Sequence, residues 1–131
     1  MHRPFLLIGS VLGLLGVAIG AFGAHALRSR LSPEMQAIFE TGVRYHMYHV
    51  FALLIVAAAI GQAGPARLLV VSGWSFMAGI VIFSGSLYAL ALTGTTTLGA
   101  ITPIGGLGFI VGWGCLALYA TWSALPVDPI R

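Results

Sequence analysis

The stretch between Arg67 and Asp128 contains no Asp, Glu, Lys, Arg or His. A charged side chain at the centre of a membrane-spanning helix costs about 2.5–3.5 kcal/mol on insertion scales, so lipid-crossing segments exclude such residues. A soluble domain needs a charged surface, whereas this chain is 7% charged and 59% hydrophobic. The sequence therefore predicts an integral membrane protein.

Four segments are long enough to cross a bilayer, whose hydrocarbon core of about 30 Å needs roughly 20 apolar residues as helix. We predict an all-α, four-transmembrane-helix bundle in one domain, residues 1–131, with spans over about 5–26, 45–61, 68–92 and 101–125. The first run is longer than the 7–15 apolar residues of a signal peptide, so we expect it to be retained as a span.

The polar residues before the second span predict an amphipathic lead-in. Ser32-Pro33-Glu34 is a helix start signal, with a capping side chain, a proline at the first position and an acid in the first turn. Residues 33–45 mix apolar and charged side chains, as an interfacial helix does. This helix either bends at Gly42 or continues to Gly61.

Orientation in the membrane stays open. An even number of spans places both termini on one side, and three arginines then fall on each side of the bilayer. Those on the terminal side are Arg3, Arg67 and Arg131, and those on the other are Arg28, Arg30 and Arg44.

Small residues recur at helical spacing in three of the spans, and in lipid such stripes let helices approach closely. The stripe residues are Gly9, Gly13, Gly16, Gly20 and Gly23 in the first span, Gly79 in the third, and Gly105, Gly108 and Gly112 in the fourth. We expect them to pack helices, within the bundle or between copies of a homo-oligomer. The alternative is a pore past Ser75, Gly79 and Ser86, which has no charged ring to give selectivity.

Most titratable side chains lie in residues 25–49, so any chemistry must draw on this region. The candidate polar or ligand-binding residues here are His25, Glu40, Arg44, Tyr45, His46 and His49. An ionisable residue at membrane depth is a functional-site hypothesis by default. His46 and His49 share a helix face, but helix-bundle metal sites also use carboxylates, and Glu40 points elsewhere. We favour an interhelical hydrogen bond between His25 and His49 or with backbone carbonyls, and an exposed pairing of Glu40 with Arg44.

No nucleophile–base pair is visible, so we assign no catalytic residue, metal or cofactor and lean against an enzyme. Without a basic patch, nucleic acid is also excluded as a partner.

Several motifs together resemble one family. They are Gly20–His25 (GAFGAH), Tyr45–His49 (YHMYH), Phe83–Tyr88 (FSGSLY), Thr102–Gly106 (TPIGG) and Gly112-Trp113. In this order they look like the YgdD-like family of small bacterial inner-membrane proteins, also called the domain-of-unknown-function 423 family, which has a eukaryotic transmembrane branch. The resemblance implies a four-helix inner-membrane protein and no particular activity.

The resemblance also bears on the candidate site. The family pattern usually has Gln where this chain has His46, whereas His25 and His49 match it, which favours pairing of those two. It adds Ser84, Ser86 and Tyr88 as a polar feature of the third span.

Three functional classes remain open at this point. We expect a non-enzymatic structural, lipid- or partner-interacting membrane protein, with membrane lipid as its main partner. The alternatives are a channel or transporter for a small solute or proton, and a histidine-dependent metal, haem or quinone protein.

Overall fold

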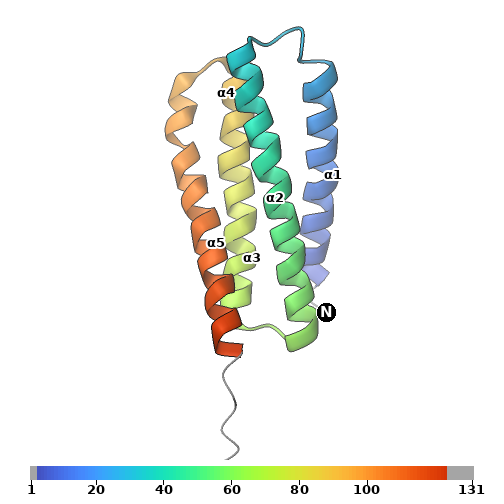
Figure 1. The fold of residues 1–131 in the computed structure, drawn as a ribbon, viewed down its shortest axis with the longest axis vertical. Helices are drawn as coiled ribbons and strands as arrows, with labels where there is room; N and C mark the ends of the chain where they lie inside the picture. The colour runs from blue at the N-terminus through green and yellow to red at the C-terminus, as the bar shows by residue number, and fades with distance from the viewer. Residues whose placement is uncertain (1–2, 124–131) are drawn as a thin grey trace, which may run out of the picture.

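The computed structural model describes residues 3–123, and within that range every regular element is a helix. The helices form four rods, and Figure 1 shows that neighbouring rods run antiparallel. Their elements are α1 (Arg3–His25), α2 (Pro33–Ala63), a third rod of α3 (Arg67–Gly79), η1 (Ile80–Ser84) and α4 (Gly85–Thr93), and a fourth of η2 (Thr96–Ala100) and α5 (Thr102–Ser123). All four are long and apolar enough to cross a membrane, so the predicted four-span, all-α fold is confirmed.

The boundaries of the second span differ most from the prediction. The helix start predicted at Ser32-Pro33 is confirmed, and α2 runs without interruption from Pro33 to Ala63, so it does not bend at Gly42 and it extends twelve residues before the predicted span. The side chain of Ser32 caps it by accepting a 3.2 Å hydrogen bond from the Met35 amide. The amphipathic lead-in is therefore the first part of α2 itself. Residues 124–125, at the predicted end of the fourth span, lie outside the described residues.

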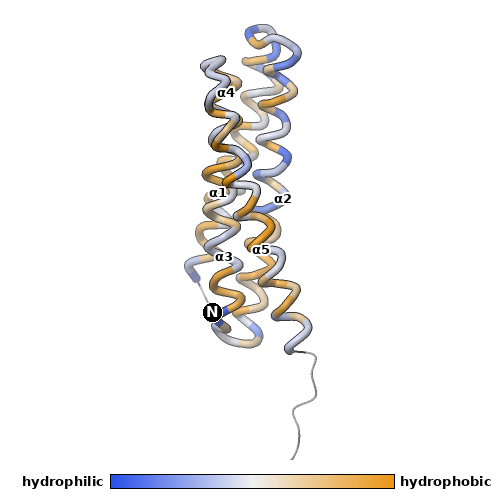
Figure 2. Tube along the Cα trace, turned by 90° about the vertical axis from the view of Figure 1, so that its left-hand side faces the viewer, coloured by the Kyte–Doolittle hydropathy of each residue, from blue (hydrophilic) through white to orange (hydrophobic). Residues whose placement is uncertain are grey.

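The rods lie in the order α1, α2, third rod, α5 (Figure 1). α1 packs along α2, which in turn packs on α3, η1 and α4, and α5 packs on α3 and η1. Hydrophilic residues gather along the first part of α2 and the loop before it, as Figure 2 shows. The main apolar core consists of Phe5, Val50, Ala52, Leu53, Val56, Ala57, Ile60, Leu69, Phe76, Ile80 and Phe109.

The glycine stripe of α1 faces α2 along its whole length. A methyl group added to Gly9 would lie 2.8 Å from Leu54, and one added to Gly16 would lie 2.5 Å from the sulfur of Met47. At the far end, Gly23 lies against the ring of Phe39. Because these glycines have no side chains, the backbones of α1 and α2 can approach each other closely.

A second glycine seam joins α5 to the third rod. Gly105 lies against the backbone of Phe83, and Gly112 lies against the ring of Phe76. Beside this seam, the buried hydroxyl of Ser72 donates a 2.8 Å hydrogen bond to the Gly112 carbonyl.

The third rod contains a π-helical segment, η1, between two α-helical stretches. A π turn holds one more residue than an α turn, so it lets neighbouring residues face different partners. Phe83 faces α5, whereas the buried hydroxyl of Ser84 donates a 2.8 Å hydrogen bond to the Gly42 carbonyl of α2.

Candidate functional site

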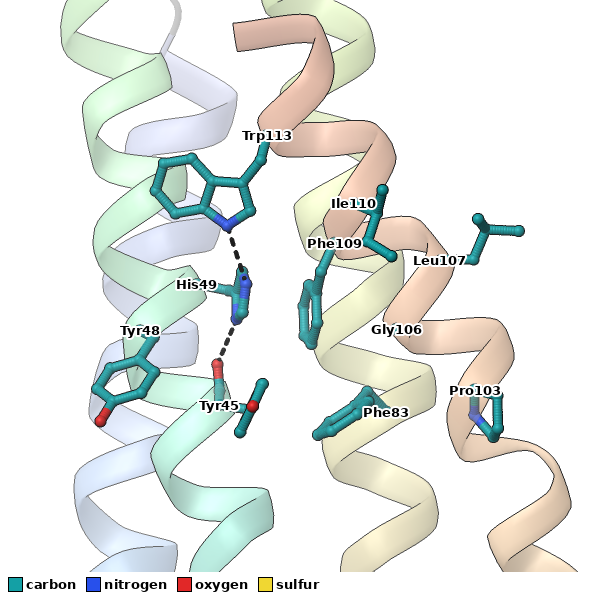
Figure 3. Close-up of a pocket in the computed structure, with 10 residues that line it drawn as sticks. All are labelled: Tyr45, Tyr48, His49, Phe83, Pro103, Gly106, Leu107, Phe109, Ile110 and Trp113. Carbon is teal, nitrogen blue, oxygen red and sulfur yellow. Dashed lines mark hydrogen bonds between the residues drawn. The ribbon is translucent and has the colours of Figure 1, made fainter. Parts of the chain in front are cut away.

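A groove of about 920 Å³ lies between α2 and α5, and Figure 3 shows the side chains around it. α2 contributes Tyr45, Tyr48 and His49, and η1 contributes Phe83. α5 contributes the other lining residues, which are Pro103, Gly106, Leu107, Phe109, Ile110 and Trp113. The rim is exposed, with Tyr48 at 56% and Ile110 at 69%. The groove opens on the outer surface of the bundle.

His49 lies buried on the floor of the groove, with both ring nitrogens engaged. Nδ1 lies 2.7 Å from the Tyr45 carbonyl, which can only accept, so Nδ1 carries the proton. Nε2 therefore accepts the 3.2 Å hydrogen bond that the Trp113 indole N–H donates. The ring also stacks on Phe109, with centroids 3.4 Å apart and planes 6° apart. The geometry fixes a neutral imidazole that ties α2 to α5.

The groove covers about half the depth of the membrane. Pro103 lies at the start of α5, and Trp113 follows ten residues later. At 1.5 Å per residue, this interval is about 15 Å, half of a 30 Å hydrocarbon core. The groove therefore lies within one leaflet.

His46 makes a separate interhelical junction. Its Nε2 donates a 2.9 Å hydrogen bond to the Leu12 carbonyl of α1, which the missing side chain of Gly16 leaves within reach. Its Nδ1 then accepts the proton of the Tyr88 hydroxyl, 3.0 Å away on α4. A methyl group on Gly42 would lie 2.8 Å from the Tyr88 ring, so this glycine lets the tyrosine pass α2.

The expected pairing of His25 with His49 is wrong. His25 ends α1, is exposed, and hydrogen-bonds through Nδ1 to the Ala21 carbonyl at 2.9 Å. His49 lies sixteen residues into α2, about 24 Å from the helix start. The expectation measured the depth of His49 from the predicted span start near residue 45, whereas the loop that joins α1 to α2 ends twelve residues earlier, at Pro33. Tyr88 accordingly meets His46 and not His49.

The hydroxyl groups of the third rod join helices instead of lining a path. Ser84 reaches α2, and Ser86 accepts the Thr102 hydroxyl of α5 at 2.7 Å while donating to the Phe83 carbonyl. At Gly79, where the pore alternative needed space, the ring of Phe109 fills the axis. These contacts count against a water path through a single copy of the chain.

Glu40 and Arg44 lie on the other side of α2, in a smaller cavity against α1. Glu40 accepts a 3.3 Å hydrogen bond from the amide of Gln36, in place of the expected pairing with Arg44. Tyr45 belongs to the α2–α5 groove. The structure thus separates the candidate residues instead of bringing them together in one site.

Sequence reasoning missed Phe109 and Gln36 as site residues. Phe109 lies in an apolar run where nothing marks it as the partner of a histidine. Trp113 appeared only as part of a resemblance motif, although an indole N–H buried in a membrane needs an acceptor. That requirement was the one available signal for its contact with His49.

No group of three His, Cys, Asp or Glu side chains within residues 3–123 could hold a metal ion. The nitrogens of His46 and His49 are occupied by protein partners, so neither ring can bind a metal without rearranging. What the groove offers a ligand is an aromatic, apolar surface.

Comparison with known proteins places the chain among bacterial membrane proteins. Residues 19–106 match the DUF423 family, described as proteins of unknown function. The chain is 44% identical over 111 residues to the UPF0382 membrane protein YwdK of Bacillus subtilis, an alignment covering 85% of this chain and 90% of the relative. It is 39% identical over 117 residues to a UPF0382 membrane protein of Haemophilus influenzae, covering 89% and 93%. No solved structure matches. The family resemblance and the membrane location predicted from the sequence are confirmed.

Proposed function

We propose that this chain, which belongs to the DUF423 family of small bacterial membrane proteins, is a non-enzymatic lipid-binding protein that holds one hydrocarbon chain in its α2–α5 groove. The observation that carries the proposal is the groove itself. Its volume lies within the roughly 300–1,000 Å³ of small-molecule sites, and its lining is almost wholly apolar or aromatic.

The shape of the rim favours a flexible chain over another helix. Helices associate in lipid where small residues let their backbones approach. Here large exposed side chains, such as Tyr48, Leu107 and Ile110, stand on both edges and would hold a helix away. A lipid chain can enter between them, and the length of the groove suits a chain that extends from one leaflet surface to the bilayer midplane.

His49 and Trp113 support this role by closing the floor. Their mutual hydrogen bond and the stacking on Phe109 leave the imidazole without a free lone pair or proton. The groove thus presents aromatic faces to a hydrocarbon and no nucleophile or base.

Fluorescence quenching by lipids with brominated acyl chains tests this proposal. In a Trp74→Phe/Trp122→Phe background, Trp113 is the single tryptophan, and we expect strong quenching in brominated bilayers. Gly106→Leu should reduce it, because a methyl group at Gly106 meets nothing closer than 3.8 Å and the larger side chain would fill the groove.

Gly61→Leu is the matched control, since a side chain at Gly61 also meets nothing within 4 Å but lies at the opposite end of α2. It should leave the quenching unchanged. Equal quenching in Gly106→Leu and the parent would refute occupation of the groove by lipid. Weak quenching in the parent itself would indicate another protein helix in the groove and would also refute the proposal.

A further inference from the structure

A second cavity, of about 270 Å³, lies between α1 and α2 on the far side of α2 from the groove. Its walls include Gly20 and Gly23 of α1 and Gln36, Glu40 and Arg44 of α2. It lies at the end of the bundle where α1 ends and α2 begins (Figure 1). Unlike the groove, this cavity brings a cation and an anion together.

Arg44 marks the membrane boundary on α2. It is the last charged residue before residues 45–66, which contain no Asp, Glu, Lys or Arg. The helical part of this stretch, residues 45–63, spans about 28 Å, close to the 30 Å of a hydrocarbon core. The guanidinium is exposed and, within residues 3–123, has no hydrogen-bond or ion-pair partner. An arginine at this depth reaches for lipid phosphate.

Glu40 lies one turn further from the membrane centre, about 6 Å along the helix. The amide of Gln36 holds its carboxylate at 3.3 Å. The same amide nitrogen donates to the Gly23 carbonyl at 3.2 Å, at the C-terminal end of α1, where carbonyls lack helical partners. These two acceptors fix the orientation of the Gln36 amide, and its Oε1 is left buried without a partner.

We propose that this cavity binds the head group of phosphatidylethanolamine, with the phosphate on Arg44 and the primary ammonium on Glu40. The order of charges carries the assignment: cation at the membrane boundary, anion one turn outward. A zwitterionic phospholipid presents the complementary order, because its phosphate lies next to the glycerol and its amine lies further from the hydrocarbon chains. A primary ammonium has three N–H donors with which to bind the Glu40 carboxylate. A choline group has no N–H, and the glycerol head group of phosphatidylglycerol has no positive charge for Glu40 to attract.

The binding is independent of the α2–α5 groove. Native mass spectrometry of detergent-purified protein would count retained lipids after mixing with phosphatidylethanolamine, phosphatidylcholine or phosphatidylglycerol of identical chains. We expect phosphatidylethanolamine to bind about tenfold more tightly than the other two, which is the effect of one or two charge-assisted hydrogen bonds. Equal retention of the three lipids would overturn the proposal.

Single substitutions test the ammonium contact of Glu40 and the phosphate contact of Arg44 separately. Glu40→Gln should abolish the preference over phosphatidylcholine, and Arg44→Gln should weaken all phospholipids, whereas Gly106→Leu should change neither result. Arg28→Gln is the charge-matched control, because Arg28 is exposed at the same end of the bundle but does not line the cavity. An Arg28→Gln protein that loses lipid as strongly as Arg44→Gln would show unspecific charge attraction and refute the site.

Competition with soluble glycerophosphoethanolamine tests whether the ligand is the lipid or its free head group. If the lipid is the ligand, a millimolar excess should fail to displace it, since the hydrocarbon chains contribute to binding. Full displacement would make the free head group the ligand and overturn the lipid assignment. Circular dichroism of each variant checks that the helices remain folded, and a variant that is unfolded is replaced by the milder Glu40→Asp or Arg44→Lys, for which we expect partial retention of the preference.

Discussion

The two histidines of α2 carry their ring protons on different nitrogens, and each position follows from its neighbours. His46 donates from Nε2 to a carbonyl of α1, whereas His49 donates from Nδ1 to a carbonyl of its own helix. The remaining nitrogen of each ring then accepts, from Tyr88 in one case and from Trp113 in the other. Every polar ring atom is paired, as a buried group in lipid requires. Their role in the structure is to join helices.

Replacement of His46 tests this role at a single side chain. His46→Leu removes two interhelical hydrogen bonds, which in membrane proteins average about 0.6 kcal/mol each, so we expect a loss of about 1–2 kcal/mol of unfolding free energy. His46→Gln should stay within about 0.5 kcal/mol of the parent, because an amide also offers one donor and one acceptor. Reversible unfolding in mixed detergent–SDS micelles measures both.

Tyr88→Phe is the companion variant, since it removes only the hydrogen bond to Nδ1 of His46. It should lose about 0.6 kcal/mol, roughly half the effect of His46→Leu. If His46→Gln lost as much unfolding free energy as His46→Leu, the shape of the imidazole ring, and not its hydrogen bonds, would account for the stability.

At the scale of the helix, adjacent glycines have opposite roles. Gly105 faces the third rod, where an added methyl group would lie 2.7 Å from the Phe83 Cα, and backbone cannot move aside cheaply. Gly106 faces the groove, where the nearest atom is 3.8 Å away. The α5 seam thus depends on the first glycine, and the open groove depends on the second.

This difference gives a matched pair of substitutions. Gly105→Ala should destabilise the protein by about 1–3 kcal/mol through overpacking. Gly106→Ala should be neutral or stabilising by up to about 1 kcal/mol, because alanine is the better helix former and nothing obstructs its methyl group. Unfolding in detergent–SDS micelles compares the two, and equal effects would contradict the packing of α5 described above.

The helices could be predicted largely because lipid imposes length and polarity on them. Ser32, Pro33 and Gly64 mark ends that short-range chemistry dictates, and the structure has them as ends. The early part of α2 was harder to predict, because Phe39 and Gly42 are buried only when α1 and α4 pack around them. No residue type signals the π turn of η1, which lacks proline. The depth of each residue in the membrane, and therefore the partner of each histidine, depends on that tertiary packing and could not be predicted from the sequence.

For the whole molecule, the antiparallel order of four rods places successive connections at opposite ends. The loop of residues 26–32 joins α1 to α2 at one end, and residues 64–66 join α2 to α3 at the other (Figure 1). Both binding sites proposed above lie in the half nearer the first loop. The two leaflets would therefore meet different surfaces of the protein.

Single-cysteine labelling checks this arrangement in intact cells or oriented vesicles. In a Cys115→Ala background, Ser29→Cys and Ala66→Cys should react with a membrane-impermeant maleimide from opposite sides. The result would also decide the orientation that the equal arginine counts leave open. Labelling of both positions from the same side would contradict the four-span topology.

The π turn in the third rod has a consequence for how sequences of this family can evolve. One extra residue in a helical turn is the trace that a single-codon insertion leaves when a helix absorbs it without unwinding. Loss of one residue between Ile80 and Ser84 would restore an ordinary helix and turn Phe83 and Ser84 away from their present partners on α5 and α2. Relatives with a one-residue gap there should therefore also differ at Gly42 and Gly105, the positions that receive those two side chains.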